Sequence, residues 1–170
     1  MIEGLELLSQ RFSKDQRGFS RKIRLVESFL ADELFVSRSG KNVIRGMHFQ
    51  VEPHLQRKII AVIEGGIHGV VMDLRNGSRS FLEVFEVDIT AESHKAILIP
   101  NQCAWGYETL EEENIVIYAI EGEYSKVDER GIRYDSLGVE WRCMQNNASP
   151  ILNIRDQELP SLERYLEEIK

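Results

Sequence analysis

Cysteine is scarce in this chain, whose 170 residues include only Cys103 and Cys143. Neither belongs to a CxxC pair or lies beside a basic run, so the sequence indicates neither a disulfide framework nor a cysteine nucleophile. It also lacks the run of roughly 20 apolar residues that a transmembrane helix needs. Residues 1–18 lack the basic and apolar regions of a signal peptide. We therefore expect a cytoplasmic protein that does not bind membranes.

Positive charge and paired metal ligands are also in short supply. The 21 Lys and Arg residues are outnumbered by 28 Asp and Glu residues, and the net charge of −7 argues against nucleic acid as a partner. A small cluster of basic side chains around one phosphorylated ligand is still compatible with this balance. The four histidines, at positions 48, 54, 68 and 94, occur singly and form no HxH pair. No metal site is expected.

Short segments rich in Ile and Val make up most of the chain from residue 43 onward. They cover residues 43–51, 58–65, 67–75, 81–89, 96–100, 104–110 and 114–120. In the fourth segment odd-numbered and even-numbered positions fall on opposite faces, as in a strand with one face on a core. Seven strands without a long intervening helix predict an antiparallel sandwich or barrel. Hairpin turns are predicted at 64–66 and 76–78.

Helices are predicted at two places. One is residues 22–29, where Ile23 and Val26 share a face, and the other is residues 160–170, with Pro160 near the first turn. The apolar stripe of the second helix consists of Leu162, Tyr165, Leu166 and Ile169. We expect a single all-β domain with an N-terminal arm over about 1–30, a barrel over about 31–145 and a C-terminal segment over about 146–170.

Several polar residues could carry chemistry, but each also has an ordinary structural role. Arg45 and His48 lie three residues apart, so in a regular strand they point to opposite faces unless the intervening glycine allows a β-bulge. Tyr118 lies in an apolar strand, where a tyrosine is usually part of the core. Asp156 suits a helix cap or a loop ion pair. Taken singly, these residues fit structural roles better than catalytic ones.

Taken in order, the segments resemble the dTDP-4-dehydrorhamnose 3,5-epimerase family of nucleotide-sugar epimerases. The shared elements are D-x-R-G-x-F (15–19 here, one residue shorter), R-G-L-H-F-Q (45–50), Q-x-K-L-V (56–60), G-x-V-x-x-V-x-V-D-x-R (65–75), P-x-G-x-A-H-G-F (100–107), a tyrosine strand (Tyr118), a late tryptophan (Trp141) and L-S-x-K-D (152–156). The resemblance extends over roughly residues 13–162. No single element is decisive, whereas the ordered set is specific.

The resemblance implies a cupin-like antiparallel β jelly roll with short peripheral helices and a C-terminal helix. It also implies a homodimer, in which the arm of one subunit reaches the neighbour's sheet, and chemistry without a metal or an organic cofactor. The implied substrate is a dTDP-, CDP- or GDP-linked 4-keto-hexose, epimerised at C3, C5 or both. Such sugars are made for deoxysugar, cell-surface polysaccharide or secondary-metabolite biosynthesis.

The resemblance also assigns roles to nine residues. They are the general base (His48), its orienting partner (Asp156), a cation facing the keto oxygen (Lys58), an acid on the opposite face (Tyr118), contacts to the diphosphate (Arg45, and Arg17 from the arm), a residue near the nucleotide (Tyr124) and two further residues at the substrate (Gln50 and Trp105). The chemistry suits these types: a C–H next to a ketone needs a base with a pKa near neutral, a cation for the enolate and a second proton donor.

The chain departs from the family pattern at several positions. Trp105 replaces the histidine of A-H-G, and Gly69 replaces an aspartate of the preceding hairpin. Glu33 and Phe35 stand where the family has the two amides of Q-x-N-x-S. We therefore expect the substrate to differ from dTDP-4-keto-6-deoxyglucose or to be a variant of it, with one-carbon epimerisation open beside two-carbon epimerisation. A non-catalytic sugar-nucleotide-binding cupin and a metal-dependent cupin are the alternatives.

Overall fold

β-Strands make up most of the molecule. The computed structural model describes residues 1–169, and within them twelve strands form two five-stranded sheets and one two-stranded hairpin. The strands are β1 (Glu6–Ser9), β2 (Arg11–Asp15), β3 (Gly18–Lys22), β4 (Glu33–Ser39), β5 (Ile44–Gln50), β6 (Arg57–Glu64), β7 (Gly66–Asp73), β8 (Val84–Thr90), β9 (Lys95–Ile99), β10 (Cys103–Thr109), β11 (Asn114–Glu121) and β12 (Glu129–Gly131). Each of the seven predicted segments contains a strand, although β8 begins three residues later than its segment.

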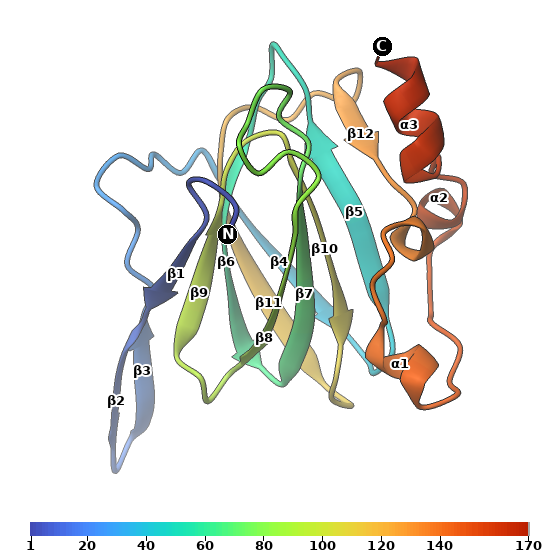
Figure 1. Ribbon diagram of the computed structural model, residues 1–170. Helices are drawn as coiled ribbons and strands as arrows, with labels where there is room; N and C mark the ends of the chain where they lie inside the picture. The colour runs from blue at the N-terminus through green and yellow to red at the C-terminus, as the bar shows by residue number, and fades with distance from the viewer. Residues whose placement is uncertain (170) are drawn as a thin grey trace.

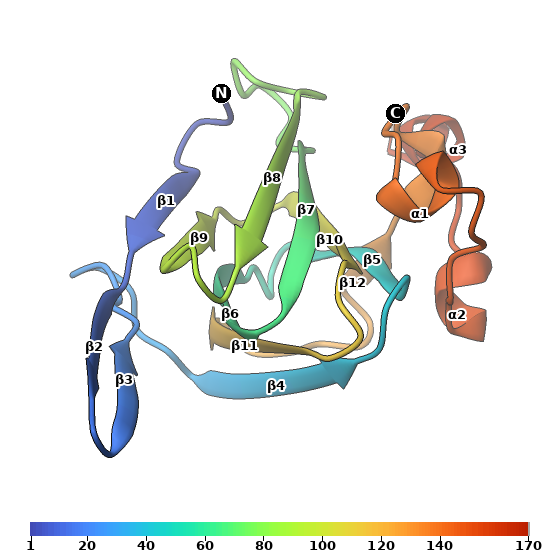
Figure 2. The ribbon, with the colours of Figure 1, turned by 90° about the horizontal axis from the view of Figure 1, so that it is seen from below.

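The two large sheets are antiparallel and face each other. The first has the strand order β1-β9-β6-β11-β4, and the second has the order β12-β5-β10-β7-β8. From β5 to β7 and from β8 to β11 the chain passes repeatedly from one sheet to the other, as in a jelly roll (Figures 1 and 2). The expected cupin-like fold is confirmed.

Apolar side chains fill the space between the sheets and cover their outer faces. Ile60, Val71 and Ile97 belong to the inner cluster and are fully buried. A second cluster, which includes Trp141, lies between the second sheet and the C-terminal segment, and a third, which includes Phe29, covers the outer face of the first sheet. The inner cluster holds the two sheets at a fixed separation, and the candidate site lies between them.

Three short helices follow the last strand. They are α1 (Arg142–Gln145), α2 (Ile154–Gln157) and α3 (Leu162–Glu168), and they lie beside β5 and β12 (Figures 1 and 2). Ser161 caps α3 by accepting a hydrogen bond from the Arg164 N–H at 3.3 Å, and Tyr165 is buried. The predicted C-terminal helix is confirmed, although Ile169 remains half exposed. No helix within residues 1–169 is both long and apolar enough to cross a membrane.

Two local predictions are wrong. Residues 22–29 contain no helix, because Lys22 ends β3 and the chain continues irregularly with Ile23 and Val26 packed on the first sheet. Residues 64–66 are not a hairpin, because β6 and β7 belong to different sheets and the Gly65 turn carries the chain between them. The turn at 76–78 does connect two paired strands, β7 and β8, as expected.

The pairing of β5 with β10 contains a bulge at the glycine of the R-G-x-H element. Trp105 pairs with His48 and Tyr107 pairs with Arg45, so three steps along β5 match two steps along β10. Gly46 lies in this interval with a φ of 116°, and a Cβ there would lie 2.6 Å from the backbone of β10. The extra residue allows Arg45 and His48 to line the same cavity.

Candidate active site

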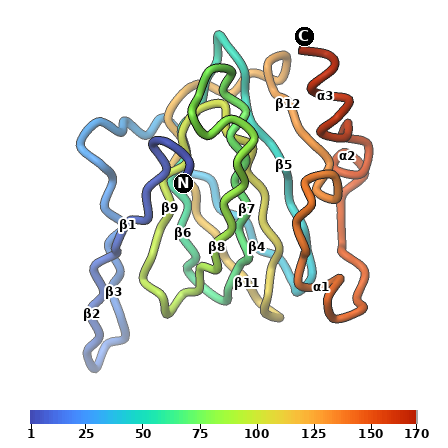
Figure 3. The backbone as a smooth tube through the Cα atoms, in the orientation of Figure 1, coloured from blue at the N-terminus to red at the C-terminus, as the bar shows by residue number. Residues whose placement is uncertain are grey.

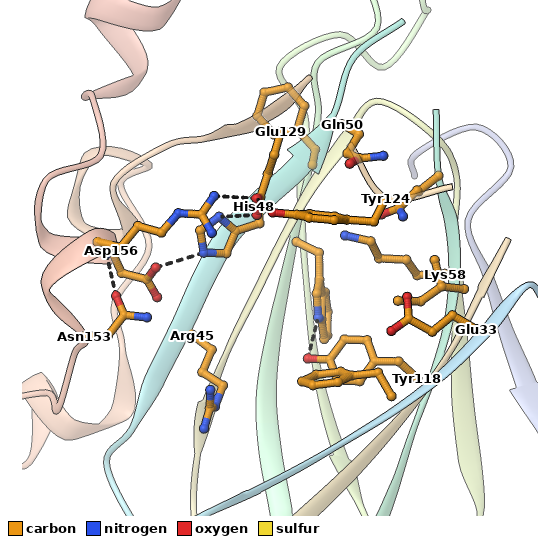
Figure 4. Close-up of a pocket in the computed structure, with 16 residues that line it drawn as sticks. Glu33, Arg45, His48, Gln50, Lys58, Tyr118, Tyr124, Glu129, Asn153 and Asp156 are labelled. Atoms are coloured by element: carbon orange, nitrogen blue, oxygen red, sulfur yellow. Dashed lines mark hydrogen bonds and ion pairs between the residues drawn. The ribbon is translucent and has the colours of Figure 1, made fainter. Parts of the chain in front are cut away.

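A cavity of about 480 Å³ opens between the two sheets. Its volume lies within the roughly 300–1,000 Å³ that is usual for small-molecule sites. Aromatic and aliphatic side chains share its wall with charged and amide groups (Figure 4). The lining residues are Glu33, Phe35, Arg45, His48, Phe49, Gln50, Gln56, Lys58, Trp105, Tyr118, Ile120, Tyr124, Glu129, Asn153, Arg155 and Asp156. Eight of the nine residues expected at the site are among them, and Arg17 is not.

His48 and Asp156 form a hydrogen-bonded histidine–carboxylate pair in the wall of this cavity. His48 extends from β5, and Asp156 extends from α2, where Asn153 accepts a hydrogen bond from the Asp156 N–H. The Nε2 of His48 donates to Oδ1 of Asp156 at 2.9 Å, and the Gly46 N–H donates to Oδ2 at 3.1 Å. Burial raises the pKa of Asp156, but these hydrogen bonds outweigh it and hold the pKa below its usual value. An ionised Asp156 therefore fixes the orientation of the His48 ring.

The other ring nitrogen of His48 faces a second carboxylate. Nδ1 has no hydrogen-bond partner among the residues described and lies 3.8 Å from Oε1 of Glu129. Glu129 accepts a hydrogen bond from the Tyr124 hydroxyl at 2.7 Å and pairs with Arg155 at 2.5 Å. Burial raises the pKa of Glu129, whereas the bonds from Arg155 and Tyr124 bring it below its usual value. A proton taken up at Nδ1 is therefore stabilised by a nearby anion.

Two cations in the wall have no carboxylate partner. No ion pair within residues 1–169 involves Arg45 or Lys58, and the Arg45 guanidinium donates to the Ser39 hydroxyl at 3.1 and 3.2 Å. Lys58 extends from β6, where burial lowers its pKa to about 8 and the charge of Glu129 opposes the shift. Both cations are therefore available to an anionic ligand.

Tyr118 approaches the cavity from the sheet opposite to His48. It extends from β11 of the first sheet, whereas His48 extends from β5 of the second (Figure 4). The rings of Phe35 and Tyr107 pack near it, with centroids 5.2 and 6.5 Å away. Burial raises the pKa of the phenol well above its usual value. Tyr118 is therefore a proton donor at neutral pH, placed across the cavity from an imidazole.

Gln50 and Arg17 differ from the other predicted residues in their surroundings. Gln50 lines the cavity, but its Nε2 donates to the Glu123 carbonyl at 2.9 Å and its Oε1 accepts from the Ser125 N–H at 2.7 Å, so its amide fastens a loop. Arg17 lies in the turn of the β2–β3 hairpin, which projects from the sheets (Figure 3), and pairs with Asp15 at 2.6 Å. Within one chain, Arg17 lies outside the cavity.

The structure adds Glu129 and Arg155 to the residues expected from the sequence. Arg155 occupies the lysine position of the L-S-x-K-D element, so that element already contained a signal. Glu129 lies in a segment without a recognisable motif, and only the folded chain brings it to His48. Glu33 and Phe35, two departures from the family pattern, both line the cavity.

Comparisons with known proteins agree with this geometry. The family model for dTDP-4-dehydrorhamnose 3,5-epimerase matches residues 1–164. A Shigella flexneri protein of that name is 33% identical over 146 residues, which span 85% of this chain and 77% of the relative, and one from Salmonella typhimurium is 31% identical over 156 residues, spanning 91% and 82%.

Solved structures with the same name are also similar. The structure from Bacillus anthracis, with TDP and PPi bound, has a TM-score of 0.86 at 31% identity and covers 94% of each chain. The structure from Sulfolobus tokodaii has a TM-score of 0.86 at 33% identity and covers 95% of this chain and 92% of that one. The chain belongs to the dTDP-4-dehydrorhamnose 3,5-epimerase family of isomerase-class epimerases.

Proposed function

We propose that this chain epimerises a nucleotide-linked 4-keto-hexose at C3, C5 or both by removing and returning a proton through an enolate. The observation that carries the proposal is the placement of His48 and Tyr118 on facing sheets, with their side chains in one cavity. Inversion at a carbon requires one group to take a proton from one face and another to deliver a proton to the opposite face.

The remaining residues complete the reaction. His48, held by Asp156 at 2.9 Å, takes the proton, and the neighbouring Glu129 stabilises the imidazolium. Lys58 stabilises the negative charge that develops on the keto oxygen, a type of interaction that contributes roughly 3–4 kcal/mol per donor in other enzymes. Tyr118 delivers a proton to the other face. The guanidinium of Arg45, which forms no ion pair within residues 1–169, binds the diphosphate.

The cavity wall and a relative with a bound nucleotide both bear on the identity of the ligand. The Bacillus anthracis relative holds TDP, which supports a thymidine nucleotide here. Glu33 and Phe35 bring a carboxylate and an apolar ring to the cavity in place of two amides. We expect these two residues to shift the preference away from dTDP-4-keto-6-deoxyglucose toward a variant sugar or another nucleotide.

Solvent exchange tests the proposed reaction. The protein is incubated in D₂O with dTDP-, CDP- and GDP-linked 4-keto-hexoses, and deuterium is located by NMR. Deuterium at C3 or C5 of at least one of these sugars supports the epimerase. If the protein binds a candidate but no candidate gains deuterium, the non-catalytic binding cupin replaces the enzyme.

A metal-dependent cupin is the third hypothesis for the function of this chain. Residues 1–169 contain no group of three or more His, Cys, Asp or Glu side chains arranged to hold a metal ion. This hypothesis is tested by metal analysis of the purified protein and by exchange assays in the presence of a chelator. Deuterium exchange that stops on chelation and returns with an added metal would favour it over the mechanism above.

Activity is expected to fall in alkaline solution as Lys58 loses its proton. The pKa of Lys58 is about 8, so the cation needed at the keto oxygen is present below that pH and is lost above it. Turnover should therefore decrease by about tenfold per pH unit above about 8. The comparison is with Lys58→Arg, whose guanidinium stays charged throughout. An alkaline decrease of the same steepness in that variant would show that a different group titrates.

We also propose a homodimer and a cytoplasmic location. The projecting β2–β3 hairpin exposes Phe12 and Phe19, at 40% and 60%, and carries Arg17 beyond the chain's own sheets. A second copy that covers these rings would receive Arg17 near its cavity. Light scattering should give twice the mass of the chain, and Arg17→Ala should weaken nucleotide binding without changing that mass. A monomer with full activity would contradict the dimer.

The scarcity of cysteine supports the proposed cytoplasmic location.

A further inference from the structure

Trp105 connects the two halves of the proposed catalytic machinery. It extends from β10, where it pairs with His48 of β5 in the second sheet. Its indole Nε1 donates to the hydroxyl of Tyr118, which belongs to the first sheet, at 3.5 Å. Both side chains are more than nine-tenths buried. The indole therefore spans the space between the sheets, beside the base and against the acid.

We propose that Trp105 is a positioning residue for proton delivery by Tyr118, and that Gly69 is the position that makes room for it. This inference rests on the proposed function and deepens it. An indole N–H can only donate a hydrogen bond, so the Tyr118 oxygen accepts in this contact and the contact does not use the proton of the phenol. When the phenol gives that proton to the enolate carbon, the O–H electrons stay on oxygen as a phenolate. The N–H that pointed at the phenol now stabilises this anion.

The length of the contact is compatible with such a role. At 3.5 Å it is longer than an ordinary N–H···O bond, as catalytic hydrogen bonds often are before substrate binds. Burial disfavours a phenolate at this position, so a donor to the oxygen has a larger effect than it would in water. Both groups return to their starting states by proton exchange with solvent, and no further reactant is needed.

The absence of a side chain at Gly69 leaves room for the indole of Trp105. A Cβ on Gly69 would lie 2.5 Å from Cη2 and 2.8 Å from Cζ3 of Trp105, which is closer than packed atoms allow. Gly69 lies on β7, next to β10, and pairs with Tyr107. Any other residue at position 69 would push the indole out of its place. The two departures from the family pattern, at 69 and 105, therefore form one structural unit.

The proposal predicts a change in the partition of the enolate rather than a general loss of activity. In Trp105→Phe, His48 still removes a proton and returns one from solvent on the same face, which is seen as deuterium exchange with retention. Delivery by Tyr118 becomes slower because the phenolate loses its donor. The ratio of inversion to exchange should fall by about tenfold to a hundredfold. Gly69→Ala should lower the same ratio, and Gly69→Ala in the Trp105→Phe background should lower it no further.

Trp141→Phe is the matched control, because Trp141 is also fully buried and its indole N–H also donates one hydrogen bond, to the Tyr134 carbonyl at 3.1 Å. It should lower stability and leave the ratio unchanged. A wild-type ratio in Trp105→Phe would overturn the proposal while leaving the epimerase intact. Absence of exchange in the unaltered protein would instead overturn the proposed function.

A measurement without substrate tests the contact itself. The chain has two tryptophans, so Trp141→Phe leaves Trp105 as its only indole. In that background, Tyr118→Phe removes the hydrogen-bond acceptor and should shift the Trp105 fluorescence to shorter wavelength. Unchanged emission would overturn the proposed contact even if no substrate had been identified.

Discussion

Replacing His48 with asparagine is expected to lower turnover by about 10²–10⁴-fold, the usual contribution of a general base. Asparagine can still donate to Asp156, so the wall of the cavity keeps its shape. It cannot accept a proton from carbon at neutral pH. Nucleotide binding, measured by calorimetry with dTDP, should remain within a few-fold of the unaltered protein.

The matched control is His94→Asn, a histidine that lies outside the cavity and stacks on Phe12 with ring centroids 4.3 Å apart. This variant should keep its turnover. If His48→Asn retains full turnover while it binds nucleotide normally, His48 is not the base. If both variants lose activity to the same extent, general destabilisation explains the loss.

The second large effect is expected for Asp156→Asn. The carboxylate accepts hydrogen bonds from His48 and from the Gly46 N–H, and it is ionised because these bonds outweigh its burial. An amide does not stabilise an imidazolium and allows the ring to adopt the wrong tautomer. In enzymes with a comparable histidine–carboxylate pair, this substitution costs about 10⁴-fold in turnover. We expect a loss of about 10²–10⁴-fold here.

Asp73 provides a matched control for a buried carboxylate. It is fully buried, pairs with Arg75 at 2.8 Å and accepts hydrogen bonds from Ser78 and Ser80, but it lies outside the cavity. Asp73→Asn should reduce the free energy of unfolding by about 3–5 kcal/mol and leave the turnover of the folded fraction unchanged. Denaturation curves and turnover measured on the same samples separate the two effects. Equal loss of turnover in Asp73→Asn would contradict a specific role for Asp156.

The order of motifs in the sequence predicts most of the cavity. His48, Lys58, Tyr118 and Asp156 lie far apart in the chain, and only the resemblance to a family links them before the structure is known. The R-G-x-H spacing is compatible with a regular strand or with a bulge at the glycine, and the structure has the bulge that brings Arg45 and His48 to one face. The structure places these residues around one cavity, and their roles in the reaction stay predictions.

Other features depend on contacts that no local pattern contains. Glu129 reaches His48 because β12 pairs with β5, and a three-residue strand gives little periodicity to recognise. The Gly-Gly turn at 65–66 is compatible with a hairpin or with a passage between sheets, and only long-range pairing decides between them. Residues 22–29 have helical spacing, but their apolar side chains pack on an existing sheet surface, which overrides that preference.

The close packing of Trp105 against Gly69 is another feature that the sequence pattern does not predict. Each residue is visible in the sequence as a separate departure from the family pattern. Their dependence on each other appears only when β7 and β10 are paired, because a Cβ at Gly69 would then overlap the indole. Departures at two positions can thus be one change in packing.

The most direct test is a crystal structure of the His48→Asn variant with a 4-keto-hexose nucleotide bound. Enclosure of a pyranose between the side chains of two opposed sheets is the feature that every role above assumes. We predict that one ring carbon next to the ketone lies between residue 48 and the Tyr118 hydroxyl, about 3–4 Å from each and on opposite faces, with Lys58 at the keto oxygen. A sugar bound outside this space, or one that meets both side chains on the same face, would contradict the account.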